Sequence, residues 1–213
     1  MEKCEFIRSV SDLKKYLQAN TNSPSLKTLL IHSCCGPCSS AVLEKLSKCF
    51  NITIYFYNPN IDTYDEFDKR YDEQKRLIEE MGLNINVIKG NYDENSFLNA
   101  IKGLESLGER SIRCYNCYYE RLYASAIYAK ENNFDYFTTT LSISPYKNSN
   151  WINEIGLKLE KEVNVNFLYS NFKLEDGYKR SIELSKIHNL YRQDYCGCKF
   201  SKKERDERIK TKK

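Results

Sequence analysis

The sequence lacks any apolar run that approaches the ~20 residues needed to cross a membrane. Its N-terminal segment, MEKCEFIRSVSDLKKYLQAN, also lacks the apolar core of a signal peptide. We therefore expect a cytoplasmic protein without a membrane partner. A chain of 213 residues can bury a real core, and we expect a single domain over residues 1–213.

Common nucleotide-binding and catalytic motifs are missing too. The sequence contains no GxGxxG, no GxxxxGK[ST] and no HExxH, so none of the familiar dinucleotide, P-loop or zinc-protease signatures is present. Histidine is scarce, with only His32 and His188. One falls in a predicted strand and the other near a predicted helix end, so a structural role is expected for both.

Outside the C-terminal tail, residues 199–213, the sequence has no excess of positive charge. The formal net charge of the chain is +4, and the tail, KFSKKERDERIKTKK, alone carries a net +5. A tail of this kind is typical of a solvated, frayed helix, and the alternative is an arm that contacts nucleic-acid phosphates. Charge alone does not separate these two interpretations.

Strand-like and helix-like segments alternate along the chain. Runs rich in β-branched and aromatic residues predict strands at 28–33, 51–60, 85–90, 136–148 (ending in a loop) and 165–172. Helical periodicity predicts helices at 38–50, 64–81, 93–104, 113–134, 150–163 and 177–189. This alternation predicts an α/β fold with a mostly parallel sheet and helices on both faces. Ligands bind such sheets outside the carboxyl ends of the strands, where CCGPC, NPNID and TTTLSISPYK fall.

Cysteine, in contrast, is abundant, with nine residues in the chain. In a reducing compartment, clustered cysteines more often bind metal or act in catalysis than form structural disulfides. Two have ordinary explanations, because Cys49 lies on the apolar face of a predicted helix and nothing around Cys4 suggests chemistry. The other seven fall into three groups: Cys34, Cys35 and Cys38; Cys114 and Cys117; Cys196 and Cys198.

The spacing within each group allows the sulfurs to share one centre. Cys114 and Cys117 lie three residues apart on one face of a predicted helix. Cys35 and Cys38 open a predicted helix, where free N–H groups and the helix dipole favour the thiolate. In residues 196–198, CGC, the glycine lets the backbone bend closely around a bound group.

Seven clustered cysteines exceed what any single simple site needs. A dithiol with a resolving partner needs three, and a structural zinc or a [4Fe–4S] cluster needs up to four. The surplus favours an iron–sulfur cluster beside a second metal or beside a redox-active dithiol. Two other functions remain open: a thiol–disulfide oxidoreductase that uses Cys35 and Cys38, and a zinc-stabilised tRNA-binding module.

Five motifs together carry a likeness to a known family. In chain order they are HSCCGPCS (32–39), NPNI (58–61), RCYNCYYERL (113–122), TTLSISPYK (139–147) and LYRQDYCGCKFS (190–201). They closely resemble the cobalamin-independent epoxyqueuosine reductases, QueH. The likeness spans nearly the whole chain in the right order, which makes it far more specific than CGPC alone.

The resemblance implies a fold similar to the adenine-nucleotide-hydrolase-like (HUP) group, with a metal site at the C-terminal edge of the strands. It implies the two-electron reduction of the epoxide of epoxyqueuosine, at the tRNA wobble position, to queuosine, the last step of queuosine biosynthesis. The cofactors implied are a [4Fe–4S] cluster and a second, mononuclear iron. The partners implied are the tRNA anticodon loop and an external electron donor such as ferredoxin, flavodoxin or an artificial reductant.

The same resemblance assigns roles to particular residues of this chain. The metal ligands implied are Cys34, Cys35, Cys38, Cys114, Cys117, Cys196 and Cys198. The catalytic candidates are Cys35, Asp194 and Tyr146, the last two by proximity to the motifs. By their places beside the motifs, the candidates for binding an unstacked base and its phosphates are Arg113, Tyr118, Arg121, Lys147 and Arg192. For Tyr118 and Arg121, core packing and salt bridging are an equal alternative to RNA contact.

Overall fold

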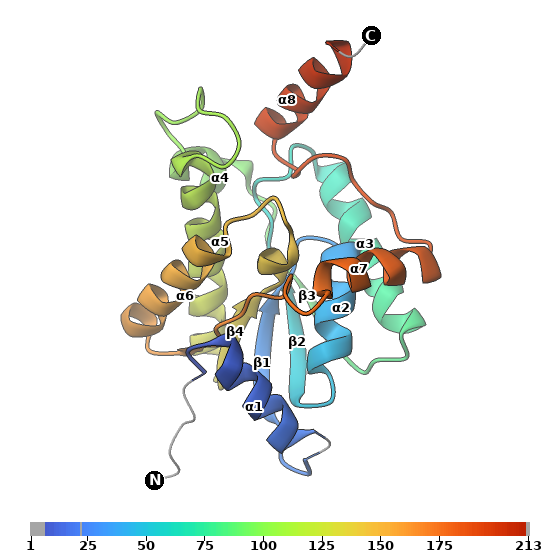
Figure 1. Ribbon diagram of the computed structural model, residues 1–213. Coiled ribbons are helices and arrows are strands. Elements are labelled where there is room, and N and C mark those ends of the chain that lie inside the picture. Colours follow the sequence, from blue (N-terminus) through green and yellow to red (C-terminus); the bar gives the residue numbers. More distant parts are fainter. Residues whose placement is uncertain (1–6, 22, 212–213) are drawn as a thin grey trace.

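A sheet of five parallel strands in the order β3-β2-β1-β4-β5 lies at the centre of the computed structural model, which describes residues 7–21 and 23–211 (Figure 1). The strands are β1 (Lys27–His32), β2 (Phe50–Phe56), β3 (Asn86–Lys89), β4 (Tyr136–Thr139) and β5 (Asn166–Phe167). The helices are α1 (Val10–Asn20), α2 (Gly36–Leu46), α3 (Tyr64–Glu80), α4 (Glu94–Ala100), α5 (Ile112–Glu131), α6 (Ser149–Val163), α7 (Gly177–Ile187) and α8 (Lys199–Lys210), with a short 3-10 turn, η1 (Thr140–Ile143), after β4. The predicted α/β fold with a parallel sheet is confirmed.

Apolar side chains of the central strand β1 point alternately to two separate cores. Leu29 and Ile31 pack in the core formed with α1, α2 and α7, and Leu30 packs in the core formed with α5 and α6. Because both faces are covered, the strand reads as a continuous apolar run rather than an alternating one. Figure 1 shows α2, α3 and α7 on one side of the sheet and α5 and α6 on the other, so the prediction of helices on both faces is confirmed.

The direction in which strands are added reverses at β1. From β1 the chain adds β2 and β3 on one side, and it then returns to add β4 and β5 on the other. In open α/β sheets, ligand sites lie at such a switch point, beyond the carboxyl ends of the strands. The segments that follow β1 and β4 therefore meet where a site is expected.

Local signals explain most of the helix boundaries. Asp93 caps α4, since its carboxylate accepts a hydrogen bond of 3.0 Å from the Asn95 N–H. Gly82 follows α3 with a φ of +63°, the left-handed conformation of a helix C-cap. The predicted last strand is shorter than expected, because the Ser170 N–H turns away to donate to Asn153 Oδ1 at 3.0 Å.

The basic tail is helical over Lys199–Lys210 and projects beyond the carboxyl ends of the strands, as Figure 1 shows. Residues 212–213 and Cys4 lie outside the described residues, so what was predicted for them stays a prediction. Within the described chain, none of the helices is both long enough and apolar enough for a bilayer span.

Candidate metal centre

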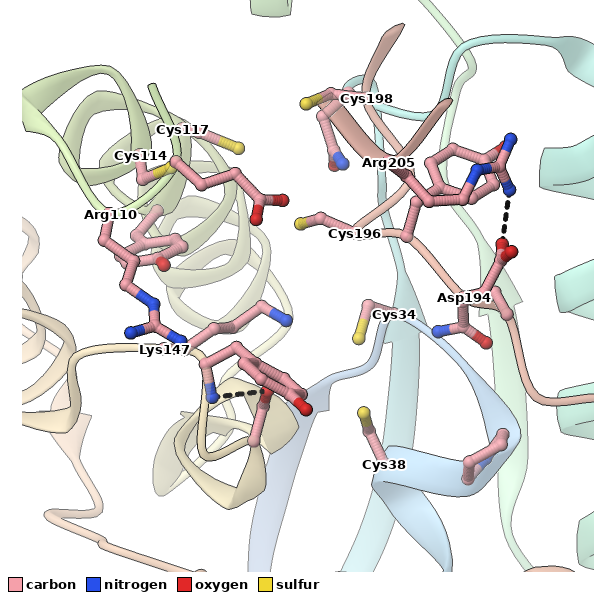
Figure 2. Close-up of a pocket in the computed structure, with 18 of the residues that line it drawn as sticks. Cys34, Cys38, Arg110, Cys114, Cys117, Lys147, Asp194, Cys196, Cys198 and Arg205 are labelled. Atoms are coloured by element: carbon pink, nitrogen blue, oxygen red, sulfur yellow. Dashed lines mark hydrogen bonds and ion pairs between the residues drawn. The ribbon is translucent and has the colours of Figure 1, made fainter. Parts of the chain in front are cut away.

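A pocket of about 700 Å³ opens beyond the carboxyl ends of β1 and β4 (Figure 2). Its walls come from the β1–α2 turn, the loop after η1, the start of α5 and the segment that leads into α8. Six of the seven cysteines predicted as metal ligands line it: Cys34, Cys38, Cys114, Cys117, Cys196 and Cys198. Three short groups that are far apart in sequence therefore face one cavity.

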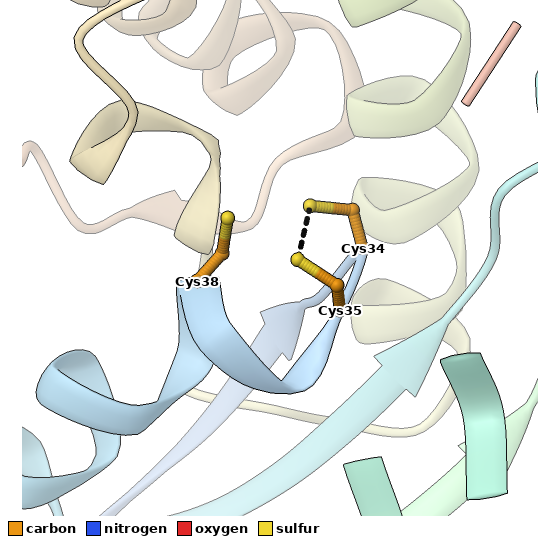
Figure 3. A group of neighbouring side chains, drawn as sticks. All are labelled: Cys34, Cys35 and Cys38. Carbon is orange, nitrogen blue, oxygen red and sulfur yellow. Dashed lines mark hydrogen bonds between the residues drawn. The ribbon is translucent and has the colours of Figure 1, made fainter. Parts of the chain in front are cut away.

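The first group, here called the β1–α2 group, consists of Cys34, Cys35 and Cys38 (Figure 3). Their three sulfurs lie within 4.8 Å of one another, and the Sγ atoms of Cys34 and Cys35 are 3.8 Å apart. Thiolates bound at about 2.3 Å in tetrahedral geometry stand about 3.8 Å apart, so this spacing suits ligands of one metal centre. Within the described chain, no other three His, Cys, Asp or Glu side chains meet the same distance limit.

Backbone geometry explains why these sulfurs converge. Cys35 occupies the N-cap position of α2 in an extended conformation, with φ −176°, and Pro37 follows at the helix start. The chain therefore turns sharply from β1 into α2, and Cys38 returns toward Cys34 within the first helical turn. Cys35 itself is 1% exposed and lies behind the pocket wall rather than in it.

The most acidic thiol of the β1–α2 group is Cys34. Its pKa falls well below the usual value because Cys35 and Cys38 direct hydrogen bonds to its sulfur, and the charges of Lys147 and Arg121 act in the same direction. Cys35 and Cys38 donate to Cys34, and the pKa of each is raised. That of Cys35 rises to about 11. The sequence predicts thiolates on Cys35 and Cys38; the structure instead concentrates the negative charge on the residue directly before them.

The other two cysteine groups form what we call the opposite wall, which consists of Cys114 and Cys117 from α5 with Cys196 and Cys198 from the C-terminal segment. Figure 2 shows the two pairs at the end of the pocket away from Cys38, with their sulfurs directed toward each other. Cys117 and Cys198 pack with Phe97 and Ile101 in a small apolar cluster. Burial raises the pKa of Cys117 to about 11 and also raises the pKa of Cys114 and of Cys198. The raised pKa values favour the thiol form, so a metal ion bound here would have to displace protons.

The CGC segment of the opposite wall is held from one side by Asp62. The Asp62 N–H donates to Gly197 O at 2.9 Å, and its carboxylate accepts from Tyr195 Oη and Lys202 Nζ, each at 2.7 Å. Gly197 has a φ of +125°, and a Cβ there would stand 3.1 Å from Nη1 of Arg70. The glycine predicted to bend around a bound group is therefore required by both conformation and space.

From the other side, the C-terminal segment is tied to the loop before α5. The Cys196 N–H donates to Ser201 Oγ at 3.0 Å, and the Ser201 hydroxyl in turn donates to the Glu109 carboxylate. Arg113 forms a 3.0 Å ion pair with Glu204 of α8. Hydrogen bonds and ion pairs that span large sequence separations thus set the position of the CGC sulfurs.

The catalytic candidates predicted from the sequence occupy different depths. Tyr146 lines the pocket and is 66% exposed, and Asp194 also lines it but is ion-paired with Arg205. Cys35 lies behind the pocket wall, as described above. Their catalytic roles stay predictions.

Four of the five predicted substrate-binding residues line the pocket: Arg113, Tyr118, Lys147 and Arg192. The structure brings Lys147 into it with an ammonium that has no carboxylate partner among the described residues (Figure 2). Arg121 is placed differently: it is 2% exposed, lies beneath the cysteines and does not line the pocket. Direct contact between Arg121 and a substrate is therefore not supported.

Several pocket residues were not singled out from the sequence. They are Asn60, Glu109, Arg110, Gln193, Arg205 and Arg208. The available signals were modest, since Asn60 lies in the NPNI motif, Glu109 and Arg110 directly precede the RCxxC motif, and Arg208 belongs to the basic tail. Only the fold shows that the tail helix contributes side chains to the pocket that holds the cysteines.

Known proteins resemble this chain over most of its length. The model of the family "Epoxyqueuosine reductase QueH" matches residues 29–204, which include every cysteine of the pocket. The chain belongs to the QueH family. It is 35% identical to epoxyqueuosine reductase QueH of Streptococcus pyogenes serotype M1, over 95% of this chain and 80% of the relative. It is 38% identical to the Staphylococcus aureus QueH (86% and 79% covered) and 41% identical to the Histophilus somni QueH (81% and 71%).

The family predicted from the five motifs is thus confirmed, and QueH relatives match most of the chain. A solved structure also aligns, the U34-tRNA thiolase NcsA from Methanococcus maripaludis with its [4Fe-4S] cluster. Its TM-score is 0.46 at 12% identity, with 87% of this chain and 65% of that chain covered. A likeness this distant carries no argument about this chain.

Proposed function

We propose that this QueH chain reduces the epoxide of epoxyqueuosine at the wobble position of tRNA to give queuosine. The reaction converts the epoxide to an alkene, takes up two electrons and two protons, and releases the oxygen as water. Membership of the family of epoxyqueuosine reductases, together with six cysteines in one pocket, carries this proposal. A cytoplasmic location is part of the same proposal, because the substrate is tRNA.

The donor set of the pocket suits iron–sulfur chemistry. Three sulfurs lie within 4.8 Å of one another and four more cysteines line the same pocket, which provides more thiols than a single four-ligand centre requires. We assign the seven cysteines to a [4Fe–4S] cluster and a second iron. When bound, these metals would supply single electrons from an external donor and a Lewis acid for the epoxide oxygen.

The protein's own groups hold the substrate and deliver protons. Lys147 is half-buried and its free ammonium reaches into the pocket, so it is placed to donate a hydrogen bond to an oxygen that gains negative charge. Burial lowers the pKa of Lys147, but the nearby Cys196, Cys34 and Cys38 outweigh burial and raise it, so the amine stays charged. Tyr118 and Tyr146 add hydroxyl groups along the same wall.

Three exposed arginines at the pocket suit RNA phosphates. These rim cations are Arg110, Arg192 and Arg208, and none forms an ion pair with a described carboxylate. Many arginines elsewhere are paired, for example Arg76 with Glu73 and Arg180 with Glu44. Cations left unpaired around one opening are what a polyanion requires, and the Tyr146 ring beside Arg110 offers a surface on which an unstacked base can lie.

The thiol–disulfide alternative is not favoured by the geometry. It requires an accessible pair at Cys35 and Cys38, whereas Cys35 is 1% exposed. A zinc-stabilised binding module remains as an outcome of the experiment. Both alternatives predict that the protein does not reduce epoxyqueuosine.

The direct test is anaerobic purification with iron, sulfide and zinc analysis, followed by incubation of the reduced protein with epoxyqueuosine-containing tRNA. We expect iron and sulfide in the protein and queuosine in the digested nucleosides. A protein that keeps stoichiometric zinc after iron reconstitution contradicts the cluster. An intact cluster that forms no queuosine contradicts the reaction.

A further inference from the structure

Three arginine side chains are almost completely buried in this protein, and one of them has no carboxylate partner. Arg70, Arg113 and Arg121 are between 1% and 3% exposed. Arg70 is paired with Glu66 at 2.7 Å and Arg113 with Glu204 at 3.0 Å. For Arg121, no ion pair with any described carboxylate is present, and its Nη2 has no hydrogen-bond partner.

A buried guanidinium without an anion is costly. Arginine keeps its charge in proteins, and the penalty for taking an ion out of water amounts to several kcal/mol. Among described residues the Arg121 side chain donates a 3.2 Å hydrogen bond from Nε to the carbonyl oxygen of Cys117, and its guanidinium lies 5.9 Å from the centre of the Tyr118 ring. A carbonyl carries only a partial charge, so the position calls for a nearby anion.

The location of Arg121 identifies that anion. Arg121 lies four residues after Cys117 and seven after Cys114, so all three share one face of α5. The Arg121 side chain is 2% exposed and donates to the carbonyl oxygen of Cys117. The guanidinium therefore lies on the buried side of the cysteine site.

We propose that Arg121 is the internal counter-ion of the metal–thiolate centre, and that it favours the reduced state of that centre. A cluster held by four thiolates is an anion whose negative charge increases by one on reduction. A fixed cation at low dielectric stabilises the more negative state more strongly, and so raises the reduction potential. The inference rests on the iron–sulfur centre of the proposed function, and it gives Arg121 a positioning and electrostatic role in place of substrate contact.

The buried side of the site and its open side then each carry one positive charge. Lys147 reaches the cysteines from the pocket, where substrate and water enter, and Arg121 lies on the protein side. A substrate can displace the interactions of Lys147 during turnover, whereas nothing replaces those of Arg121. We therefore assign to Arg121 the part of the electrostatic stabilisation of the reduced centre that does not change during turnover.

The test compares Arg121→Met, which keeps length and loses charge, with Arg121→Lys, which keeps charge. By anaerobic spectroelectrochemical titration of the loaded full-length protein, we expect Arg121→Met to shift the midpoint potential downward. A tenfold weaker preference for the reduced state corresponds to about 59 mV for one electron. Arg121→Lys should recover most of the shift. Ser125→Ala is the matched control, because Ser125 donates to the Arg121 carbonyl oxygen at 2.7 Å and carries no charge.

A second measurement needs no cluster. In the metal-free protein, Arg121→Met should melt at the same temperature as the wild type or higher, because a buried charge that has no carboxylate partner among the described residues is removed. The same variant should bind Co²⁺ about tenfold more weakly than the wild type does, as followed by thiolate-to-metal absorption. An Arg121→Met protein with unchanged potential, unchanged Co²⁺ affinity and a lowered melting temperature would show a merely structural role. A shifted potential in a protein that never reduces epoxyqueuosine would leave this inference standing and reject the proposed reaction instead.

Discussion

The two sides of the cysteine pocket are assembled in different ways. The β1–α2 group comes from residues 34–38, and one strand–helix turn brings its three sulfurs within 4.8 Å. The opposite wall combines a helix with a segment about 80 residues further along the chain, joined by interactions such as those of Asp62 and Glu109. One half of the site is built by local geometry and the other by tertiary structure.

The two sides also differ in the acidity of their thiols. In the β1–α2 group, hydrogen bonds from its neighbours lower the pKa of Cys34, and the pKa values of Cys35 and Cys38 are raised. On the opposite wall, burial raises the pKa of Cys114, Cys117 and Cys198. A metal ion would displace a proton most easily from Cys34, so removal of Cys34 should be the more damaging change.

Removing Cys34 tests the local side and should have the largest effect. Cys34→Ala deletes the most acidic thiol of the group, toward which the other two are directed, and we expect metal affinity to fall by more than the ~100-fold that mutation of a supporting residue can cause. Iron and sulfide analysis after anaerobic reconstitution measures this, and queuosine formation should fall in parallel.

Cys49→Ala is the matched control for that change. Cys49 is 2% exposed and packs in the apolar core beside α1, away from the pocket. The variant should lose roughly 1 kcal/mol of stability and keep full iron content. An equal fall in iron content in both variants would mean that Cys34 acts through general stability and not as a ligand.

The same contrast explains what the sequence predicts and what it does not. The β1–α2 group is readable because a buried strand, CCGPC and a helix follow one another within a few residues. The alternation of strands and helices similarly places the other cysteine groups at one edge of a parallel sheet. Periodicity carries this information because it depends on near neighbours.

Periodicity does not reveal the interactions that join segments distant in sequence. Nothing in the sequence around Asp62 indicates that its carboxylate fixes Lys202 and Tyr195. From its motif, Arg121 is compatible with RNA contact and with core packing alike. Only the fold shows that it is 2% exposed and lacks a carboxylate partner among described residues. The shortening of β5 has a similar cause, since Asn153 of α6 captures the backbone of Ser170.

Asp62→Asn tests the tertiary side and should have a smaller effect than removal of Cys34. The variant keeps the shape of the side chain but loses the ion pair with Lys202 and weakens the bond from Tyr195. We expect a decrease of about 1 to 3 kcal/mol in the free energy of unfolding. Metal affinity should fall by about 10- to 100-fold, as for a residue that orients ligands. Denaturant titration and Co²⁺ binding measure the two effects.

The pH dependence of the same variant has a defined sign. Burial raises the pKa of Asp62, but hydrogen bonds from Lys202 and Tyr195 outweigh burial and hold it below its usual value. The contribution of Asp62 is therefore fully present above about pH 4 and is lost as the pH falls through the lowered pKa. The stability difference between wild type and Asp62→Asn should stay constant from pH 7 to 5. Asp68→Asn, which breaks an exposed pair with Lys89, is the control and should change little.

The rim cations belong to neither cysteine group, and their removal should have the smallest effect on the centre itself. Arg110 precedes α5 and Arg208 lies on α8, and neither is paired with a described carboxylate. We expect Arg110→Gln with Arg208→Gln to leave iron content and potential unchanged, and to weaken binding of an anticodon stem–loop by less than about tenfold. The slope of log K against log salt should fall by about 0.7 to 0.9 for each phosphate that the protein no longer neutralises. Arg180→Gln, which removes an arginine paired with Glu44, should leave the slope unchanged. An unaltered slope in the double variant would place the RNA-binding surface elsewhere, and the tail helix would then be a solvated surface.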